Sequence, residues 1–508
     1  MRLAGACGSA TLGPKQPAGV LMQTIEVELK FALPPDAAAV LDAHPLLQAA
    51  TETDLRQHAA TYFDTPGHDL RKAQFSCRIR DESGRRVQTL KAATGDATAR
   101  HEWEQPAAGE TPDLAHVPLP RALRKAVLDA PLEAMFTVNV ERRIWMLTKG
   151  TSLIEAACDR GWIMADARSA PVCEFELELK QGDPRDLFAL ARALAVDLPL
   201  DLDLRTKAQR GWALKDGLDD IVCDTPVPAL AADASFARGL THLAQACLEP
   251  LSANVPVLRA TQSPEALHRT RTAVRRLRAL MRVFAHHLRD NAFDELSGEL
   301  KYLSHALGAA RDLDVAGERL ALGDTLRARR DMACAHVQDV LASPRYRRLL
   351  IDFSAWLTCG NWRMRKPKKQ THGTIGDIVA LELHRWDGRI RKGAEAMHDL
   401  DPDERHKVRI RTKSLAYICE MTGGLVARRA RKERRAYLKA LKTMQSALGQ
   451  LNDARVCAAL LEELASEIGK DILRDATRRN ARGSDKRETA GRKAVARFLE
   501  TPRPFESD

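Results

Sequence analysis

Three features common in other proteins are missing from this sequence. It has no run of about 18 apolar residues, so it contains no candidate membrane-spanning helix. Its ten cysteines form no CxxC pair and no repeated spacing, which argues against a zinc site and a disulfide framework. Its first residues lack the compact apolar run of a secretory signal. We therefore expect a cytoplasmic protein with reduced thiols and no membrane partner.

Length and charge bound the organisation of the chain. At roughly 150 residues per domain, 508 residues predict two to four domains. Residues 1–21 are rich in Gly, Ala and Pro, and we expect a disordered leader there, with Met22 as an alternative start to Met1. Residues 1–222 carry a net charge of −5 and residues 223–508 one of +16. The basic half predicts a polyanionic partner, and charge alone leaves open nucleic acid, a membrane surface or polyphosphate.

The N-terminal half shows the alternation typical of β-strands. Near its start, period two places Glu26, Glu28 and Lys30 on one face and two aliphatic residues on the other. Taken alone, this segment is equally compatible with a strand half exposed to water. Counting this one, however, about eight such segments occur up to residue 180, and most have one charged face. A sandwich core would have to bury these charges, whereas a barrel with a polar lumen accommodates them.

Strand parity also predicts what this lumen contains. The expected cations are Lys30, Arg78, Arg80, Lys91 and one of Arg142 and Arg143. The expected carboxylates come from the first and last strands and are Glu26, Glu28, Glu174, Glu176 and Glu178. Many cations around one cavity predict a substrate with many negative charges. Carboxylates there predict divalent cations, which take oxygen ligands and bridge to phosphate.

Six motifs in this half, taken in order, resemble the CYTH domain, the fold of the triphosphate tunnel metalloenzymes. They are Glu26-x-Glu28-x-Lys30, Tyr62-Phe-Asp-Thr65, Arg78-x-Arg80, Thr89-Leu-Lys91, Glu174-x-Glu-x-Glu178 and Thr206-Lys207-Ala-x-Arg210-Gly211. The resemblance covers residues 22–218. It implies an eight-stranded antiparallel β-barrel tunnel that hydrolyses a bound triphosphate with Mg²⁺ or Mn²⁺.

The same resemblance implies roles for individual residues. Glu26, Glu28 and the glutamates of the Glu174–Glu178 strand would hold metal. Phosphate contacts would come from Lys30, Arg78, Arg80, Lys91, Arg142 and Lys207. The family usually has its inward Arg three residues before an aromatic, which selects Arg142 before Trp145, although a register shift would select Arg143.

Metal-assisted phosphoanhydride hydrolysis depends more on positioning and charge neutralisation than on covalent chemistry. We expect Glu26, Glu28 and Lys30 to be catalytic in this sense. Glu102, Glu104 and Asp159 are candidates to orient the attacking water. For Glu102 and Glu104, ion pairing with neighbouring basic residues is an equal alternative.

The C-terminal half has helical periodicity and an internal repeat. Residues 219–234 are rich in Pro and Ala and predict a linker. Beyond it, His268-x-x-Arg271-x-x-x-Arg275-Arg276 is matched by His406-x-x-Arg409-x-x-x-Lys413-Ser414, and Leu307-Gly308-x-x-Arg311-Asp312 by Leu448-Gly449-x-x-Asn452-Asp453. Spacings of three and seven place each His and its basic partners on one helical face. Such stacked charges repel and predict a bound anion; a solvated basic face is the alternative, which the repetition disfavours.

These elements resemble the CHAD domain over residues 235–497, with residues 498–508 as a tail. The resemblance implies an all-α domain of two pseudo-symmetric helical bundles that binds inorganic polyphosphate in a basic groove. The implied contacts are His268, Arg271, Arg275, Arg276, Arg311, His406, Arg409 and Lys413. Ser414 and Ala416 depart from the family's basic residues, which implies a weaker second site. Nucleic acid is the less favoured partner because the groove lacks interleaved aromatics for base stacking.

The segment Arg478–Lys493 is rich in Arg and Gly and predicts a frayed tail. Taken together, the sequence predicts an α+β inorganic triphosphatase that forms diphosphate and phosphate, with polyphosphate granules as one expected location in the cytoplasm. The alternatives are a class IV-type adenylate cyclase, a thiamine triphosphatase, and a non-catalytic polyphosphate-binding protein.

Overall fold

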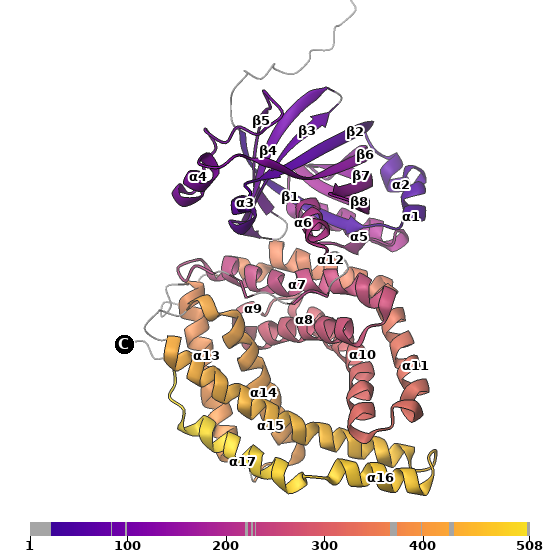
Figure 1. Cartoon of the computed structure of the whole chain (residues 1–508), viewed down its shortest axis with the longest axis vertical. Coiled ribbons are helices and arrows are strands. Elements are labelled where there is room, and N and C mark those ends of the chain that lie inside the picture. Colours follow the sequence, from indigo (N-terminus) through magenta and orange to yellow (C-terminus); the bar gives the residue numbers. More distant parts are fainter. Residues whose placement is uncertain are drawn as a thin grey trace, which may run out of the picture.

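The structure is a computed structural model that describes residues 22–504, apart from residues 83, 97–98, 219–221, 225–226, 229, 366–372, 398 and 426–430. The predicted leader and part of the predicted linker and tail therefore lie outside the described residues. A β-domain is followed by a helical domain (Figure 1), which confirms the predicted fold class. No helix in the described part of the chain is long and apolar enough to cross a membrane.

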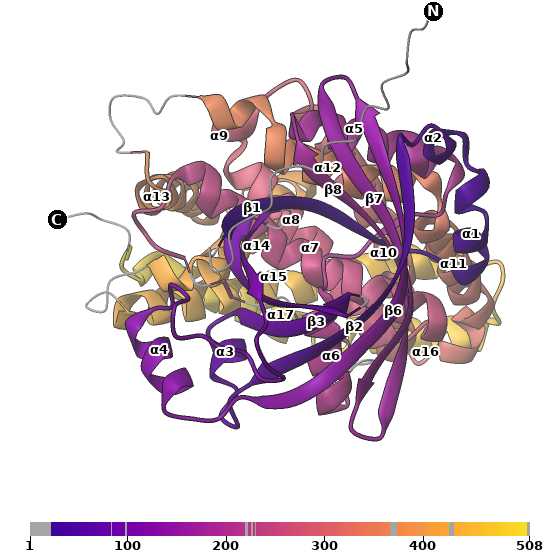
Figure 2. The same cartoon turned by 90° about the horizontal axis from the view of Figure 1, so that it is seen from above.

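The β-domain is one antiparallel sheet that curls around a central space (Figure 2). Along the sheet the strands follow the order β5-β4-β3-β2-β6-β7-β8-β1-β9. The first half of β1 also pairs with β5, from Met22 opposite Glu104 to Val27 opposite Ala99, which joins the β5 edge back to β1. The strands are β1 (Met22–Ala32), β2 (Glu52–Asp64), β3 (Phe75–Glu82), β4 (Arg85–Asp96), β5 (Ala99–Pro106), β6 (Glu133–Lys149), β7 (Ser152–Ala165), β8 (Arg168–Gln181) and β9 (Asp201–Leu202).

Short helices and two longer ones cover the outside of this sheet. Leu29, Phe31, Phe175 and Leu177 point outward from β1 and β8 into a core shared with α5, and all four are at most 1% exposed. Alternation thus sends apolar side chains out to the covering helices and charged ones inward. The helices are α1 (Pro35–Ala39), α2 (Pro45–Gln48), α3 (Asp69–Lys72), α4 (Arg121–Leu128), α5 (Pro184–Asp197) and α6 (Lys207–Asp216).

The helical domain carries its repeated motifs on equivalent helices. The two His-basic motifs lie on α8 and α14, and the two Leu-Gly motifs lie on α10 and α15. The helices are α7 (Phe236–Thr261), α8 (Pro264–Val283), α9 (Ala285–Leu288), α10 (Phe293–Leu320), α11 (Gly323–Ala342), α12 (Pro344–Cys359), α13 (Ile375–Glu395), α14 (Pro402–Met421), α15 (Arg431–Leu464), α16 (Lys470–Ala481) and α17 (Ser484–Glu500).

The prediction of a frayed tail over Arg478–Lys493 is wrong. This segment belongs to α16 and α17, which Gly483 joins in the left-handed conformation at φ 74°. Phe498 and Ala494 of α17 are buried, and Phe498 packs against Tyr437 of α15. The many arginines lie on the exposed faces and hide this short apolar stripe in the composition.

The two domains share a continuous apolar core. Phe188 of α5 and Phe353 of α12 belong to the same buried cluster, and α5 packs along α12. Charged contacts cross the same junction, because Asp201 of β9 pairs with both Arg259 and Arg347. The helical domain is therefore anchored to the strand that pairs with the end of β1.

Candidate active site

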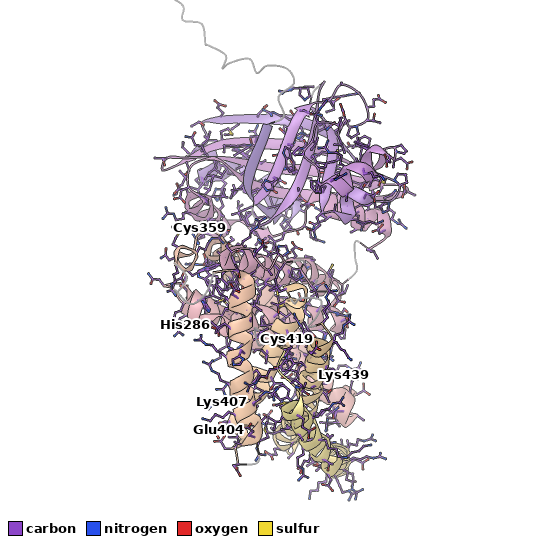
Figure 3. The ribbon with its side chains drawn as sticks, turned by 90° about the vertical axis from the view of Figure 1, so that its left-hand side faces the viewer. His286, Cys359, Glu404, Lys407, Cys419 and Lys439 are labelled. Carbon is purple, nitrogen blue, oxygen red and sulfur yellow. The ribbon has the colours of Figure 1, made fainter. Side chains whose placement is uncertain are left out.

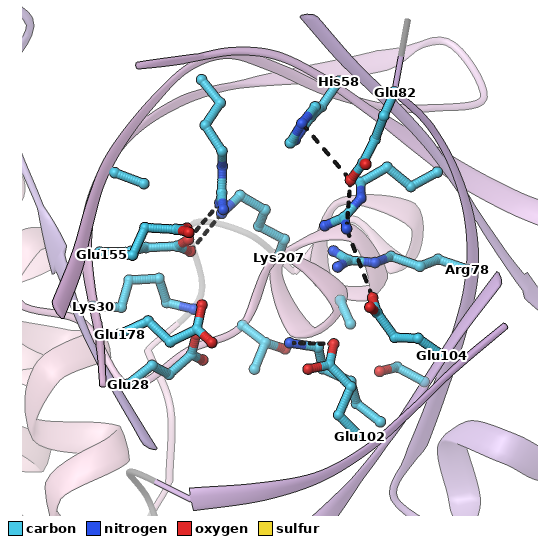
Figure 4. A pocket seen from close by; sticks show the side chains of 18 of the residues that line it. Glu28, Lys30, His58, Arg78, Glu82, Glu102, Glu104, Glu155, Glu178 and Lys207 are labelled. Carbon is cyan, nitrogen blue, oxygen red and sulfur yellow. Dashed lines mark hydrogen bonds and ion pairs between the residues drawn. The ribbon is translucent and has the colours of Figure 1, made fainter. Parts of the chain in front are cut away.

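A cavity of about 390 Å³ lies inside the curled sheet and is lined mostly by charged side chains. Figure 4 shows them converging on a common space from opposite walls. Predicted residues that line it are Glu28, Lys30, Arg78, Arg80, Lys91, Glu102, Glu104, Arg142, Glu176, Glu178 and Lys207. Arg142 lines the cavity, whereas Arg143 lies outside and its Nε donates to Asp42 at 3.0 Å. The side chain of Glu26 lies outside the described residues.

Helix α6 begins at Lys207 and places this side chain at the cavity. The Thr206 hydroxyl accepts from the Gln209 N–H at 3.0 Å, and the Gln209 side chain accepts from the Thr206 N–H at 2.8 Å. This capping box fixes the start of the helix beside Lys207. A Cβ at Gly211 would lie 2.1 Å from the ring of Phe136, so only glycine lets α6 approach β6 this closely.

Lys207 belongs to a buried ion cluster, which we define as Arg142, Lys207, Arg210, Asp159, Glu174 and Glu176. The Lys207 Nζ lies 2.7 Å from Asp159, 2.8 Å from Glu174 and 2.7 Å from Glu176. Arg142 makes two hydrogen bonds of 2.7 Å to Asp159 and also pairs with Glu176. Arg210 pairs with Glu174 from the second turn of α6.

Two predicted site residues lie in this cluster rather than on the cavity wall. Asp159 and Glu174 are each 1% exposed and do not line the cavity. Burial alone would disfavour all these charges, but their mutual attraction outweighs it. As a result the pKa of Asp159 is lowered and that of Glu176 lies well below its usual range, while the pKa of Lys207 and that of Arg142 are raised well above theirs.

Three carboxylates form a row across neighbouring strands. Glu28 of β1 is opposite Glu178 of β8, which is opposite Glu155 of β7, and all three line the cavity. Cross-strand neighbours of like charge repel. Lys180 offsets part of this repulsion, because its Nζ lies 2.7 Å from Glu178 and 3.3 Å from Glu155.

The carboxylate row has the donor chemistry of a divalent metal site, since Mg²⁺ and Mn²⁺ take oxygen ligands. Within the described ranges, however, no group of three or more His, Cys, Asp or Glu side chains is arranged to hold a metal ion. Lys180 engages one oxygen of Glu178 and one of Glu155, and the side chain of Glu26 lies outside the described residues. A metal at this row would compete with Lys180 for these two oxygens.

Cations on the opposite wall are only partly neutralised. Arg80 pairs with Glu82 at 2.6 Å, and Lys91 pairs with Glu102 at 3.2 Å. Glu104 accepts a hydrogen bond of 3.0 Å from the Thr89 hydroxyl. Arg78 donates to the Tyr62 hydroxyl at 3.4 Å, and its Nε is buried without a hydrogen-bond partner among the described residues.

His58 lines the same cavity and is 7% exposed. Burial, together with the nearby charges of Arg142 and Arg80, lowers its pKa to about 3, so it is neutral at physiological pH. Between about pH 3 and 6.5 the unfolded chain binds a proton at this position and the folded chain does not, so His58 makes stability rise with pH.

We expect the His58→Gln substitution to remove this dependence. The loss of unfolding free energy between pH 7 and pH 5 should shrink by about 1–2 kcal/mol, given roughly 1.4 kcal/mol per pKa unit. Urea denaturation at the two pH values measures it. A His58 that titrates near pH 6.5 by NMR in the folded protein would contradict this expectation.

The helical domain contains a second charged cavity, the basic groove, of about 720 Å³ between α8, α10, α14 and α15. Predicted residues that line it are His268, Arg271, Arg275, Arg311, His406, Arg409 and Lys413. Arg276 does not line it; this guanidinium pairs with Glu420 at 3.2 Å and lies 5.7 Å from the ring centroid of Tyr417.

The basic side chains of the groove are partly buried and close to one another, which disfavours their charged forms. Burial, reinforced by neighbouring arginines, lowers the pKa of His268 and of His406, so both rings are neutral at physiological pH. Burial likewise lowers the pKa of Arg275 and of Arg409. Arg271 is the better neutralised, with its guanidinium 3.2 Å from Asp312. A bound anion would relieve this arrangement.

Several lining residues were not among the predicted site residues. In the tunnel they are Arg56, His58, Glu82, Glu155 and Lys180, and in the basic groove they include Arg278, His305 and Arg455. Strand parity could have found the tunnel residues, because each lies an even number of positions from a motif or candidate residue of its own strand. The sequence predicts Arg282 as an extension of the basic surface, and the same helical spacing beyond Arg275 could have found Arg278.

Comparison with known proteins defines both parts of the chain. The CYTH domain family matches residues 24–212, and the CHAD domain family matches residues 242–462. The chain therefore combines a CYTH domain with a CHAD domain, as the sequence motifs predicted.

Similar individual proteins cover one part of the chain each. An inorganic triphosphatase of Haemophilus influenzae is 30% identical over 195 residues, which are 37% of this chain and 54%, about half, of that protein. The crystal structure of the CHAD domain from the plant Ricinus communis is 28% identical, with a TM-score of 0.49, over 56% of this chain and 97% of that one. A putative adenylyl cyclase from Hippeastrum, described as having a dominant triphosphatase activity, is 18% identical, with a TM-score of 0.28, over 37% of this chain and 95% of that one.

Proposed function

We propose that the tunnel hydrolyses inorganic triphosphate to diphosphate and phosphate with Mg²⁺ or Mn²⁺. The observation that carries this proposal is the inward convergence of Lys30, Arg78, Arg80, Lys91, Arg142 and Lys207 on one small cavity. The triphosphatase relative supports the same class of substrate. Lys30 adds to this support, because it is only 7% exposed while lining a wet cavity.

In this proposal the two walls have different tasks. Arg78, Arg80 and Lys91 hold the phosphate chain by charge-assisted hydrogen bonds. Arg142 and Lys207 face the substrate from the buried ion cluster, in which Asp159 and Glu174 fix their orientation. Glu28, Glu178 and Glu155, with Glu26 as a further donor, would hold the divalent ion, which when bound neutralises phosphate charge.

The attacking water needs an acceptor that orients it. Glu102 and Glu104 line the cavity, and each has a basic neighbour, Lys91 and Arg80 respectively. We propose that one of them releases its cation to the substrate and then accepts a hydrogen bond from the water. This transfer of Lys91 or Arg80 from its glutamate to the phosphate requires no covalent step from the protein.

The substrate is tested with a panel of tripolyphosphate, ATP and thiamine triphosphate, each assayed for phosphate release with Mg²⁺ and Mn²⁺. We expect tripolyphosphate to be turned over with the highest kcat/KM, because the described cavity wall offers charges rather than a base-binding surface. Cyclic AMP formation from ATP would favour the adenylate cyclase alternative, and thiamine triphosphate as the best substrate would favour the thiamine triphosphatase. No turnover of any of them would favour a non-catalytic protein.

We infer that the basic groove binds inorganic polyphosphate. The supporting observation is that Arg275 and Arg409 lie in the groove with lowered pKa values and no ion pair to a carboxylate among the described residues. A polyanion supplies the missing negative charge without needing base stacking.

We expect the double substitution Arg275→Gln and Arg409→Gln to weaken binding of long-chain polyphosphate at least about tenfold at low salt. The slope of log affinity against log salt should fall by about one for each cation removed. Fluorescence titration across a salt series measures both. An unchanged slope, or equally tight binding of a short RNA, would contradict polyphosphate as the ligand.

A further inference from the structure

Helix α8 carries more basic residues along the groove than the repeated motif requires. His268, Arg271 and Arg275 are followed by Arg278 and Arg282, so a His or Arg side chain recurs every three or four residues along the helix. Residues at this spacing are neighbours on one helical face. We call these five residues the α8 ladder. We call His268–Arg275 of α8 and His406–Lys413 of α14 the two half-sites. From Arg275 to Arg282 the α8 ladder extends about 10 Å beyond its half-site, at 1.5 Å per residue.

The last two members of the ladder have neutral partners. Arg278 donates to the Ser304 hydroxyl at 2.8 Å, and Arg282 donates to the Ser414 hydroxyl at 2.7 Å. Neither forms an ion pair with a carboxylate among the residues that the structure describes. Burial lowers the pKa of both guanidiniums. Two partly buried positive charges thus face the groove without a counter-charge.

The equivalent positions on α14 are not basic. The repeat aligns His268 with His406, an offset of 138 residues, and this offset places Ala416 opposite Arg278 and Glu420 opposite Arg282. Glu420 is engaged by Arg276 at 3.2 Å and also pairs with Lys442. The basic surface therefore continues along one repeat only.

A third cavity, of about 500 Å³, begins where the α8 ladder ends. Arg282 lines both this third cavity and the basic groove, and the third cavity is also lined by Arg385 and Arg389 of α13. The carboxylate there, Glu382, is 3% exposed and is already shared between His287 at 3.1 Å and Arg385 at 3.0 Å. Arg389 is exposed and forms no ion pair in the described part of the chain.

Figure 3 shows the direction of this extension. His286 lines the third cavity and lies nearer to the β-domain than Glu404 and Lys407 do. Glu404 and Lys407 belong to the first turns of α14, beside His406. The path from the His-containing half-sites through the ladder to α13 therefore runs toward the β-domain.

We propose that Arg278, Arg282, Arg385 and Arg389 form an additional anion subsite that only a long linear polyphosphate reaches. This inference rests on the proposed polyphosphate binding by the groove and adds to it an orientation and a dependence on chain length. A short oligophosphate fills the half-sites between α8 and α14. A longer chain continues past Arg275 and gains contacts at Arg282 and Arg389.

The test compares long-chain polyphosphate with tripolyphosphate on the full-length protein in the presence of a chelator. Every chain compared carries Arg78→Gln and Arg80→Gln, which weaken the proposed phosphate site of the tunnel, so that both ligands report on the basic groove. Arg389→Glu is the main variant, because this exposed side chain has no structural partner among the described residues, and Arg282→Gln is the second. Arg478→Glu, an equal charge change at an exposed position of α16 on the far side of the helical domain, is the matched control. We expect the affinity for long-chain polyphosphate to fall roughly three- to tenfold in both variants, as for a lost charged contact, with that for tripolyphosphate unchanged.

Long-chain binding that both variants leave unchanged would overturn the inference alone, and so would an equal loss for the long and short ligands. An equal loss in Arg478→Glu would overturn it too, because the effect would then come from net charge. If the wild-type chain binds no polyphosphate, the proposed function of the groove fails and the subsite fails with it.

Discussion

Replacement of Lys207 by methionine is expected to destabilise the β-domain by about 3–5 kcal/mol, the usual cost of removing one partner from a buried ion cluster. The Lys207 Nζ lies within 2.8 Å of three carboxylates, and the side chain is 10% exposed. Without it, the ion pairs that Asp159, Glu174 and Glu176 keep within the described part of the chain are those with Arg142 and Arg210. Hydrogen exchange of β7 and β8 in increasing urea measures this loss for the β-domain separately.

The loss should also depend on pH. In the wild-type chain, burial would raise the pKa of Asp159 and of Glu176, but Arg142 and Lys207 lower both. Carboxylates with lowered pKa stabilise the fold above their unfolded pKa of about 4, and this contribution fades as the pH falls through the folded value. In Lys207→Met the deficit should therefore be largest near neutral pH and smaller toward about pH 4. Lys215→Met, at a half-exposed position of the same helix, is the matched control, and an equal deficit there would contradict a special role for the cluster.

Replacement of Glu28 by glutamine is expected to lower kcat for triphosphate hydrolysis at least about 100-fold. Glutamine keeps the size of the side chain but removes the negative charge that a divalent ion requires. Glu28 sits in the carboxylate row opposite Glu178, and no apolar packing depends on it. Phosphate release under saturating tripolyphosphate measures the effect.

The matched control is Glu141→Gln. Glu141 lies on the outer face of β6, where it pairs with Arg160 at 3.0 Å, so the same chemical change is made outside the tunnel. Full activity in Glu141→Gln, together with an unchanged urea midpoint in Glu28→Gln, would assign the loss to the site. Near wild-type activity of Glu28→Gln at all metal concentrations would remove Glu28 from the proposed metal ligands.

Local alternation was enough to predict much of the tunnel. Arg78 and Arg80 alternate with the buried Cys77 and Ile79 of β3, so a period of two leaves one choice of face. Lys91 alternates in the same way with the buried Leu90 and Ala92 of β4. Arg142 was predicted only with the help of the resemblance, and the register of β6 with β2, in which it lies opposite Arg56, places it inside.

Depth within the fold could not be read from that alternation. Glu174, Glu176 and Glu178 share one face of β8, yet Glu174 is 1% exposed against Lys207 and Arg210 while Glu178 lies in the open cavity. The difference comes from α6, which begins 26 residues after the end of β8, from Gln181 to Lys207, and covers one end of the strand. Only the tertiary packing shows which carboxylates lie in the buried ion cluster and which line the cavity.

The proposed metal-dependent cleavage of inorganic triphosphate in the tunnel can be followed by ³¹P NMR. Tripolyphosphate is incubated with the purified chain in Mg²⁺, in Mn²⁺ and in excess chelator. We expect equal amounts of diphosphate and phosphate with either metal, no reaction with chelator, and no reaction in Glu28→Gln. Intact tripolyphosphate in the presence of both metals, or cleavage that chelator and Glu28→Gln leave unchanged, would contradict it.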